Sequence, residues 1–220
     1  MVEAAKSLFL ILSALFPIVD PLGGSPIFLA MTRQYSASTR RALSWRIAMN
    51  SFFLLVGSYF IGTHILSFFG ISLPVVQVGG GLIVASTGWT LLKQGGNFDA
   101  KETAQNVAPT SPYRDAFYPL TLPLTVGPGS ISVAITLGAN SPHHHGLYFW
   151  SILTAILGCA LLAVSIFLCY GFADRLGRIL GTTGMTVILQ LTSFLLVCIG
   201  VQIMWNGLSA LWVELPGHVR

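Results

Sequence analysis

The fold of this chain is decided by the stretch FPIVDPLGGSPIFLAM at residues 16–31 and its counterpart YPLTLPLTVGPGSISVAI at residues 118–135. The first stretch contains Pro17, Pro21 and Pro26, and the second repeats these prolines, each 102 positions further along the chain. Such matched spacing indicates that the chain consists of two related halves, each of which begins with the same kind of proline-rich segment.

Both proline-rich segments are expected to break a helix. A proline inside a helix removes one backbone hydrogen bond and clashes with the preceding turn, and glycine weakens a helix further. The sequences PLGGSP and PLTVGPG are therefore predicted to be unwound, with helix restarting at Pro26 after an N-cap at Ser25, and at Pro128 after Gly127. Hydrocarbon offers no hydrogen-bond partners, so unwound backbone is tolerated there only inside protein or beside a polar cavity. We therefore expect the two breaks to mark the functional site.

The composition indicates an all-α, polytopic membrane protein. Of the 220 residues, 54% are hydrophobic and only 8% are charged, far from the roughly 25% charged residues of a soluble domain. A spanning helix needs about 20 mostly apolar residues. Six stretches meet this requirement: residues 7–31, 43–66, 75–92, 117–138, 147–170 and 187–211. The chain is thus predicted to be a single integral membrane domain, in which a cytoplasmic linker at about 93–116 joins repeat one (about 7–92) to repeat two (about 117–211).

Each predicted half contains three helices, of which the first is discontinuous. The third helices also correspond, because LIVASTGW at 82–89 resembles FLLVCIGV at 194–201. An odd number of helices per half forces the second half to insert in the opposite orientation, which predicts a 3+3 inverted repeat. In the third helix, Gly81, Ala85 and Gly88 are small enough to allow close helix packing in lipid.

Basic residues are sorted between the two sides of the predicted membrane domain. Lys6 and Arg220 are the basic residues of one side, and the first, third and fifth loops contain the rest: Arg33, Arg40, Arg41, Arg46, Lys93, Lys101, Arg114, Arg175 and Arg178. By the positive-inside rule these loops are cytoplasmic and both termini are periplasmic. The basic residues that give the formal charge of +4 are thus distributed according to the sides of the membrane. We therefore expect the lipid bilayer, and no nucleic acid, as a partner.

The start of a half-helix inside the membrane is suited to binding an anion. Its free N–H groups and the positive end of its dipole point into the protein, where they attract a carboxylate. Unwound carbonyl groups and hydroxyl groups nearby are suited to an ammonium group, so the two breaks together suit a small zwitterion. The candidate substrate-binding residues are Asp20, Gly23, Gly24, Ser25, Thr121, Thr125, Gly127, Gly129 and Ser130.

Asp20 is the one carboxylate deep inside a predicted span, where a charge is costly and usually functional. It is a candidate ammonium ligand or carrier of a coupled proton. The alternative is that its side chain accepts hydrogen bonds from the N–H groups of its own break, as Asp does in turns. The sequence leaves these roles open, and the equivalent residue in the second half is Leu122.

Four segments resemble the MarC family of bacterial inner-membrane proteins, also called the neutral amino acid transporter family. They are PIVDPLGGSPIFLAMT, FGISLPVVQVGGGLIVASTG, PLTLPLTVGPGSI and LTSFLLVCIGVQ. The resemblance spans nearly the whole chain. It implies a six-helix inverted repeat in the bacterial inner membrane, which moves small neutral amino acids such as glycine and alanine without requiring sodium, with protons as a candidate coupling ion.

Three functional classes compete: a carrier, a passive small-solute channel or exporter of another metabolite, and an intramembrane enzyme. No H-E-x-x-H or G-x-S-x-G motif is present, which disfavours an enzyme. The run His143–His145 lacks the helical spacing of metal ligands, and we expect neither a metal nor a cofactor. A channel also accepts broken helices, but an inverted pair of breaks is typical of alternating access.

Overall fold

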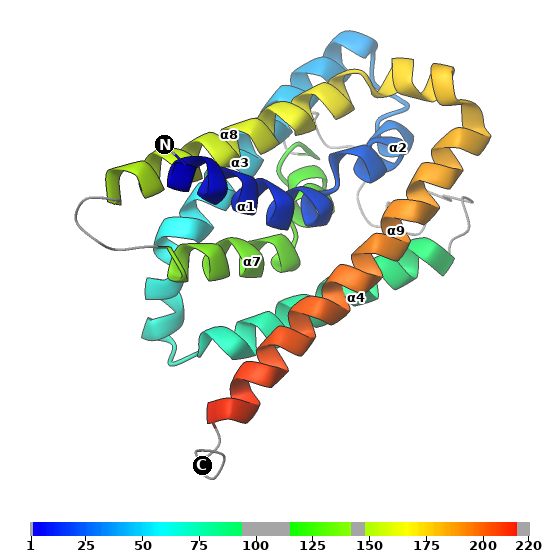
Figure 1. Ribbon diagram of the computed structural model, residues 1–220. Helices are drawn as coiled ribbons and strands as arrows, with labels where there is room; N and C mark the ends of the chain where they lie inside the picture. Colours follow the sequence, from blue (N-terminus) through cyan, green and yellow to red (C-terminus); the bar gives the residue numbers. More distant parts are fainter. Residues whose placement is uncertain (1, 94–114, 142–147, 215–220) are drawn as a thin grey trace.

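A computed structural model describes residues 2–93, 115–141 and 148–214, and all regular structure in these ranges is helical (Figure 1). The elements are α1 (Val2–Val19), α2 (Pro21–Met31), α3 (Ala37–Phe68), α4 (Leu73–Lys93), the π-helix η1 (Leu120–Thr125), α7 (Pro128–Ala139), α8 (Tyr148–Gly171) and α9 (Ala173–Glu214). Most of the predicted linker, including Lys101 and Arg114, and the run His143–His145 lie outside the described residues.

The helices confirm a polytopic membrane protein. Five helical segments in the described ranges are long and apolar enough to cross a membrane: Ala5–Met31, Ala37–Phe68, Leu73–Lys93, Trp150–Gly171 and Thr183–Val213. The predicted fourth span, 117–138, is divided between η1 and the shorter apolar helix α7. Within α9, Gly181 has a φ of 64°, and the chain bends there before the long part of the helix (Figure 1).

The burial pattern is that of a bundle in lipid. The core is built from one face of each of α1, α3 and α8, with Leu15, Leu55 and Leu162 completely buried. Large apolar side chains cover the outside, among them Phe9, which is 74% exposed, and Phe53, which is 64% exposed. A soluble monomer rarely exposes so much contiguous apolar surface, whereas lipid solvates it.

Helices α4 and α9 cross in close contact (Figure 1). A methyl group added at Gly81 would lie 2.5 Å from the backbone nitrogen of Met204 and 2.6 Å from the carbonyl oxygen of Gly200. At Gly88 it would lie 2.8 Å from the carbonyl oxygen of Ser193. The prediction that small residues of this helix allow close packing is therefore confirmed.

The helix contacts pair in the way that a two-fold inverted repeat requires. Helix α1 packs on α8 and η1 packs on α3, so the first element of each half lies against the second helix of the other half. Likewise, α2 contacts α9 and α7 contacts α4, while α4 and α9 contact each other. The inverted repeat itself stays a prediction, which these contacts support.

The basic residues of the first and fifth loops meet at one end of the bundle. This end contains the turn between α2 and α3 and the junction between α8 and α9 (Figure 1). Arg33, Arg40 and Arg178 line one pocket there. Their common location agrees with the predicted sorting of charges, while the sidedness of the termini stays a prediction.

Candidate functional site

The first helix break lies at Asp20, earlier than predicted. Asp20 has a left-handed backbone with φ 43°, and its Oδ1 accepts a hydrogen bond of 3.0 Å from the N–H of Gly23. Helix α2 therefore starts at Pro21, a residue suited to the first position of a helix. The predictions that PLGGSP is unwound and that helix restarts at Pro26 after a Ser25 N-cap are wrong.

Helix α2 continues through Pro26 because a side chain replaces the missing hydrogen bond. Pro26 has no N–H to donate to the carbonyl oxygen of Leu22, four residues earlier. The hydroxyl of Ser25 donates to that oxygen instead, at 2.9 Å. Ser25 is completely buried and acts within the helix rather than at its start.

Helix restarts at Pro128 after Gly127, as predicted, but PLTVGPG is not unwound throughout, because its first three residues belong to η1. Val126 is extended and Gly127 is the N-cap of α7, which starts at Pro128. Gly127 has no side chain that could cap the helix. The hydroxyl of Ser130 donates to the carbonyl oxygen of Gly127 at 2.9 Å. Before the break, η1 is not a regular helix, because Leu122 has extended backbone angles of φ −106° and ψ 127°.

Tyr170 of α8 connects the two breaks. Its hydroxyl lies 3.1 Å from Oγ1 of Thr125 in η1, and a methyl group added at Gly24 of α2 would meet the same hydroxyl. The Thr125 hydroxyl donates its proton to the carbonyl oxygen of Leu120 at 2.7 Å, so Tyr170 donates to Thr125. The Tyr170 ring stacks on Phe28 with a centroid distance of 4.7 Å, which fixes the hydroxyl between the breaks.

Asp20 lies on the α9 side of the same region. A methyl group added at Gly23 would meet both the Asp20 carboxylate and the hydroxyl of Thr192. Thr192 also donates to the carbonyl oxygens of Ile188, at 2.9 Å, and Leu189, at 3.1 Å. The capping role of Asp20 is thus observed, and its second carboxylate oxygen faces Thr192. The roles as ammonium ligand and proton carrier stay predictions.

The remaining predicted residues lie further from Tyr170. The hydroxyl of Thr121 donates to the carbonyl oxygen of Ala116 at 2.6 Å and accepts from the amide of Asn50 at 3.3 Å. Gly129 packs against α4, where an added methyl group would meet the side chain of Val84. The structure therefore brings Asp20, Gly23, Gly24 and Thr125 together, and assigns Gly129 to helix packing.

The region around the breaks is closed to solvent in this conformation. Four predicted residues with hydroxyl groups, Ser25, Thr121, Thr125 and Ser130, are each 2% exposed or less. Each of these hydroxyls donates to a carbonyl oxygen of its own segment. Substrate binding at these residues consequently requires a rearrangement that frees hydroxyl and backbone groups.

Sequence reasoning missed Tyr170 and Thr192 as members of this region. Tyr170 ends a predicted span that has no charged residue and no proline, and no spacing rule links it to either break. Thr192 belongs to the segment LTSFLLVCIGVQ, but nothing in that segment distinguishes it from the neighbouring Ser193. Their position follows only from how α8 and α9 pack against α2.

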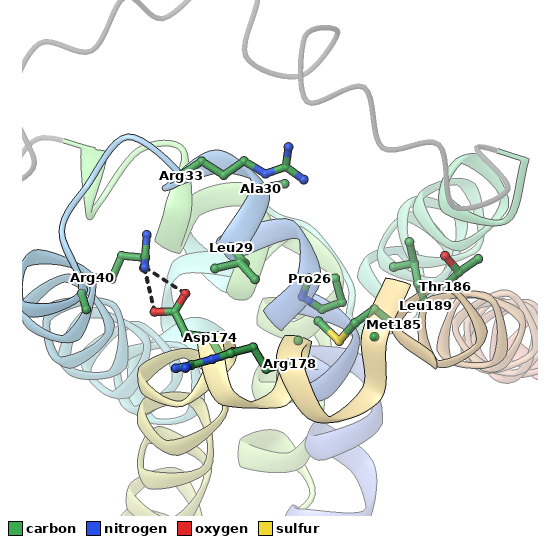
Figure 2. Close-up of a pocket in the computed structure, with 13 residues that line it drawn as sticks. Pro26, Leu29, Ala30, Arg33, Arg40, Asp174, Arg178, Met185, Thr186 and Leu189 are labelled. Atoms are coloured by element: carbon green, nitrogen blue, oxygen red, sulfur yellow. Dashed lines mark hydrogen bonds and ion pairs between the residues drawn. The ribbon is translucent and has the colours of Figure 1, made fainter. Parts of the chain in front are cut away.

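A cavity of about 560 Å³ lies at the end of α2, between α2 and the first part of α9 (Figure 2). Its lining is Pro26, Leu29, Ala30, Arg33, Ala37, Arg40, Asp174, Gly177, Arg178, Gly181, Met185, Thr186 and Leu189. None of the predicted substrate-binding residues lines it. Pro26, however, directly follows Ser25 in α2, so the cavity adjoins the predicted site without containing it.

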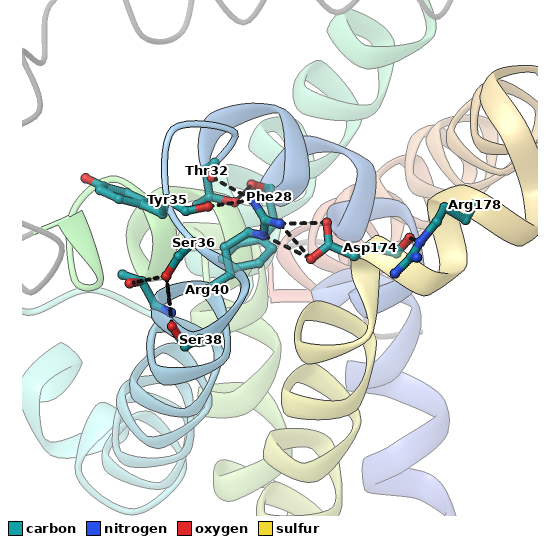
Figure 3. Close-up of polar contacts among 9 residues, drawn as sticks. Phe28, Thr32, Tyr35, Ser36, Ser38, Arg40, Asp174 and Arg178 are labelled. Carbon is teal, nitrogen blue, oxygen red and sulfur yellow. Dashed lines mark hydrogen bonds and ion pairs between the residues drawn. The ribbon is translucent and has the colours of Figure 1, made fainter.

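Arg40 joins three segments at the edge of this cavity (Figure 3). Its guanidinium donates to both carboxylate oxygens of Asp174, at 2.8 and 2.7 Å, and to the carbonyl oxygen of Tyr35, at 2.8 Å. Tyr35 in turn donates its hydroxyl proton to Asp115 at 2.8 Å. Burial and this neighbouring carboxylate raise the pKa of Tyr35, so the phenol stays a donor at neutral pH. These contacts tie the α2–α3 turn to the start of α9.

The contacts of Gly24 and Gly127, which lie near the first and second break, predict that substitution affects transport unequally at the two positions. We expect Gly24→Ala to lower transport at least about tenfold, because the new methyl group meets the Tyr170 hydroxyl, whose ring cannot move freely. Gly127→Ala is the matched control, since its methyl group would meet only the carbonyl oxygen of Pro123, at 3.2 Å. Initial uptake rates at equal protein amounts compare the two. Equal loss in both variants would contradict a special role for the Gly24 contact.

The whole length of the chain is similar to known membrane proteins. The family model described as MarC family integral membrane protein matches residues 5–212. The inner membrane protein MarC of Salmonella typhimurium is 32% identical over 213 residues, which cover 94% of this chain and 96% of that protein. The inner membrane protein MarC of Citrobacter koseri is 33% identical over 216 residues, with the same coverage. No solved structure matches. Like these relatives, the chain is a multi-pass inner-membrane protein, and it belongs to the MarC family of integral membrane proteins.

Proposed function

We propose that this protein is a secondary transporter for small neutral amino acids of the glycine and alanine class. It works by alternating access across the bacterial inner membrane, with both termini periplasmic. It does not require sodium, protons are its candidate coupling ion, and it is a carrier rather than an enzyme. The observation that supports this most is the meeting of two helix breaks at the buried Tyr170.

The chemistry around the breaks suits a small zwitterion. One carboxylate, Asp20, lies near the hydroxyls of Thr192 and Tyr170, and the N-terminus of α7 lies just beyond Thr125. A helix N-terminus favours a carboxylate, and a carboxylate with hydroxyls favours an ammonium group.

The paired helix breaks favour a carrier over a channel. Both classes accept broken helices, but discontinuous helices in corresponding positions of two repeats are typical of alternating access. The hydroxyls at the breaks are buried and bonded to their own backbone, as expected for a closed state of either class. The alternatives are a passive channel and an exporter of another small metabolite. A channel predicts flux that does not saturate, and an exporter of another metabolite predicts a different substrate.

Uptake into proteoliposomes tests the proposal. We expect saturable uptake and counterflow of radiolabelled alanine and glycine, unchanged when sodium is replaced by potassium. Alaninamide, which lacks the carboxylate, and ethylamine should compete at least about tenfold less well than alanine, because the helix end then loses its anionic partner. Flux that neither saturates nor shows counterflow would establish a channel. Equal competition by alaninamide and alanine would contradict the proposed binding site for the substrate carboxylate.

A further inference from the structure

The cavity at the end of α2 runs inward along two helices. From Arg33 in the turn after α2 its lining passes through Ala30 to Pro26, and on α9 it passes from Gly181 through Met185 to Leu189. These spacings are about one helical turn each. Both sequences of lining residues lead from the arginine-rich end of the bundle toward its middle, where Leu189 is only 3% exposed. We call this cavity, which extends along α2 and α9, the funnel (Figure 2).

The inner end of this funnel lies close to Asp20. Gly23 is three residues before Pro26 on α2, and Thr192 is three residues after Leu189 on α9, so each is about one turn further in. These two residues meet, since a methyl group added at Gly23 would contact both the Thr192 hydroxyl and the Asp20 carboxylate. About one turn of packed side chains thus separates the cavity from the region between the two helix breaks.

The outer part of the funnel has an excess of positive charge. Three arginines, Arg33, Arg40 and Arg178, line it together with a single carboxylate, Asp174. That carboxylate is bound by Arg40, while Arg178 donates to the backbone carbonyl oxygen of Asp174, at 3.3 Å. A concave surface lined by one sign of charge concentrates ions of the opposite sign and repels those of the same sign. This end therefore attracts carboxylates and disfavours cations.

We propose that the funnel is the entrance by which zwitterionic amino acids reach Asp20 from the arginine-rich end, and that its charge disfavours cationic amino acids. The inference rests on the proposed transport function and adds a path and a basis for selectivity. The substrate carboxylate is drawn to Arg33 and Arg178, and the substrate then passes between Ala30 and Met185. Separation of Pro26 from Leu189 completes the path to Asp20 and Thr192.

Cysteine modification tests whether the funnel is the path. Cys159, Cys169 and Cys198 are first replaced by serine or alanine, and Ala30→Cys then places a thiol in the wall. The control is Ile179→Cys, at the same end of the bundle but outside the lining, where the native side chain is 82% exposed. An impermeant methanethiosulfonate is added to inverted vesicles, in which the predicted cytoplasmic side faces the medium.

We expect the reagent to modify both thiols and to lower alanine uptake at least about tenfold only in Ala30→Cys. Failure to modify Ala30→Cys, or full uptake after its modification, would show that the funnel is not the entrance. Absence of alanine and glycine uptake already in the parent protein would instead refute the proposed function.

Charge substitution tests the selectivity. We expect Arg33→Gln to raise the half-saturation concentration for alanine several-fold at low ionic strength and to increase competition by lysine, with both effects reduced in high salt. Arg33→Lys, which keeps the charge, should restore the parent values. Parent-like kinetics and lysine competition in Arg33→Gln would overturn the charge argument.

Discussion

We expect Gly81→Ala to lower the free energy of unfolding by about 1 to 3 kcal/mol or more, the usual cost of overpacking. The new methyl group would meet the backbone nitrogen of Met204 at 2.5 Å and the carbonyl oxygen of Gly200 at 2.6 Å. A side chain in the way can change its rotamer, but backbone atoms of a helix cannot yield without moving the whole helix. Helix α9 must therefore separate from α4 along their entire crossing.

Gly79→Ala is the matched control on the same helix. Among the described residues, no atom beyond the adjoining residues and backbone of its own helix lies within 4 Å of the methyl group that this substitution adds. Alanine is favoured over glycine in a helix by roughly 0.5 to 1 kcal/mol, so this variant should equal or exceed the parent in stability. Thermal unfolding in detergent, followed by size-exclusion chromatography of the surviving protein, compares the two. Equal melting temperatures for both variants would contradict close packing of α4 on α9.

The parts of the fold that the sequence predicted correctly depend on local signals. The run of apolar residues in each span fixes where helices form, and Gly127 with Pro128 is a start signal that has no competitor nearby. The small residues at Gly81 and Gly88 were also correctly assigned to packing. In these cases the residues that carry the signal lie in the element that they determine.

The first break was placed wrongly because two start signals compete within seven residues. Asp20 with Pro21 and Ser25 with Pro26 are both a capping residue followed by proline. The structure uses the first pair, and Ser25 serves instead to satisfy the Leu22 carbonyl oxygen. Choosing between them requires the tertiary contacts of Gly23 and Gly24 with α8 and α9, which no local pattern contains.

Tyr170 was missed for a related reason. Its importance comes from the stacking on Phe28 and the hydrogen bond to Thr125, which join residues far apart in the chain. The cavity at the end of α2 was also not foreseen, since Arg33 and Arg178 read in the sequence only as cytoplasmic anchors. A site formed between helices is therefore harder to derive from sequence than the helices themselves.

The largest functional effect is expected at Asp20. Asp20→Asn keeps a side-chain oxygen that can accept the hydrogen bond from the N–H of Gly23, and asparagine tolerates the left-handed backbone at φ 43°. We therefore expect normal membrane insertion and melting temperature, with transport strongly reduced. Asp20→Ala is the contrasting variant, because it also removes the cap, at a cost of about 0.5 to 2 kcal/mol, and strains the backbone.

Equilibrium binding and the pH dependence of uptake then separate the roles of the carboxylate in Asp20→Asn. If Asp20 binds the substrate ammonium group, alanine affinity falls at every pH, since the amide has lost the negative charge that the ammonium group requires. If Asp20 carries the coupled proton, affinity stays near the parent value while uptake no longer responds to a proton gradient. Unchanged affinity together with an unchanged pH response would leave Asp20 with its observed role as the N-cap of α2. Substrate recognition would then belong to the backbone groups of the two breaks and to the hydroxyls of Thr125, Tyr170 and Thr192, which surround the same space without a charge.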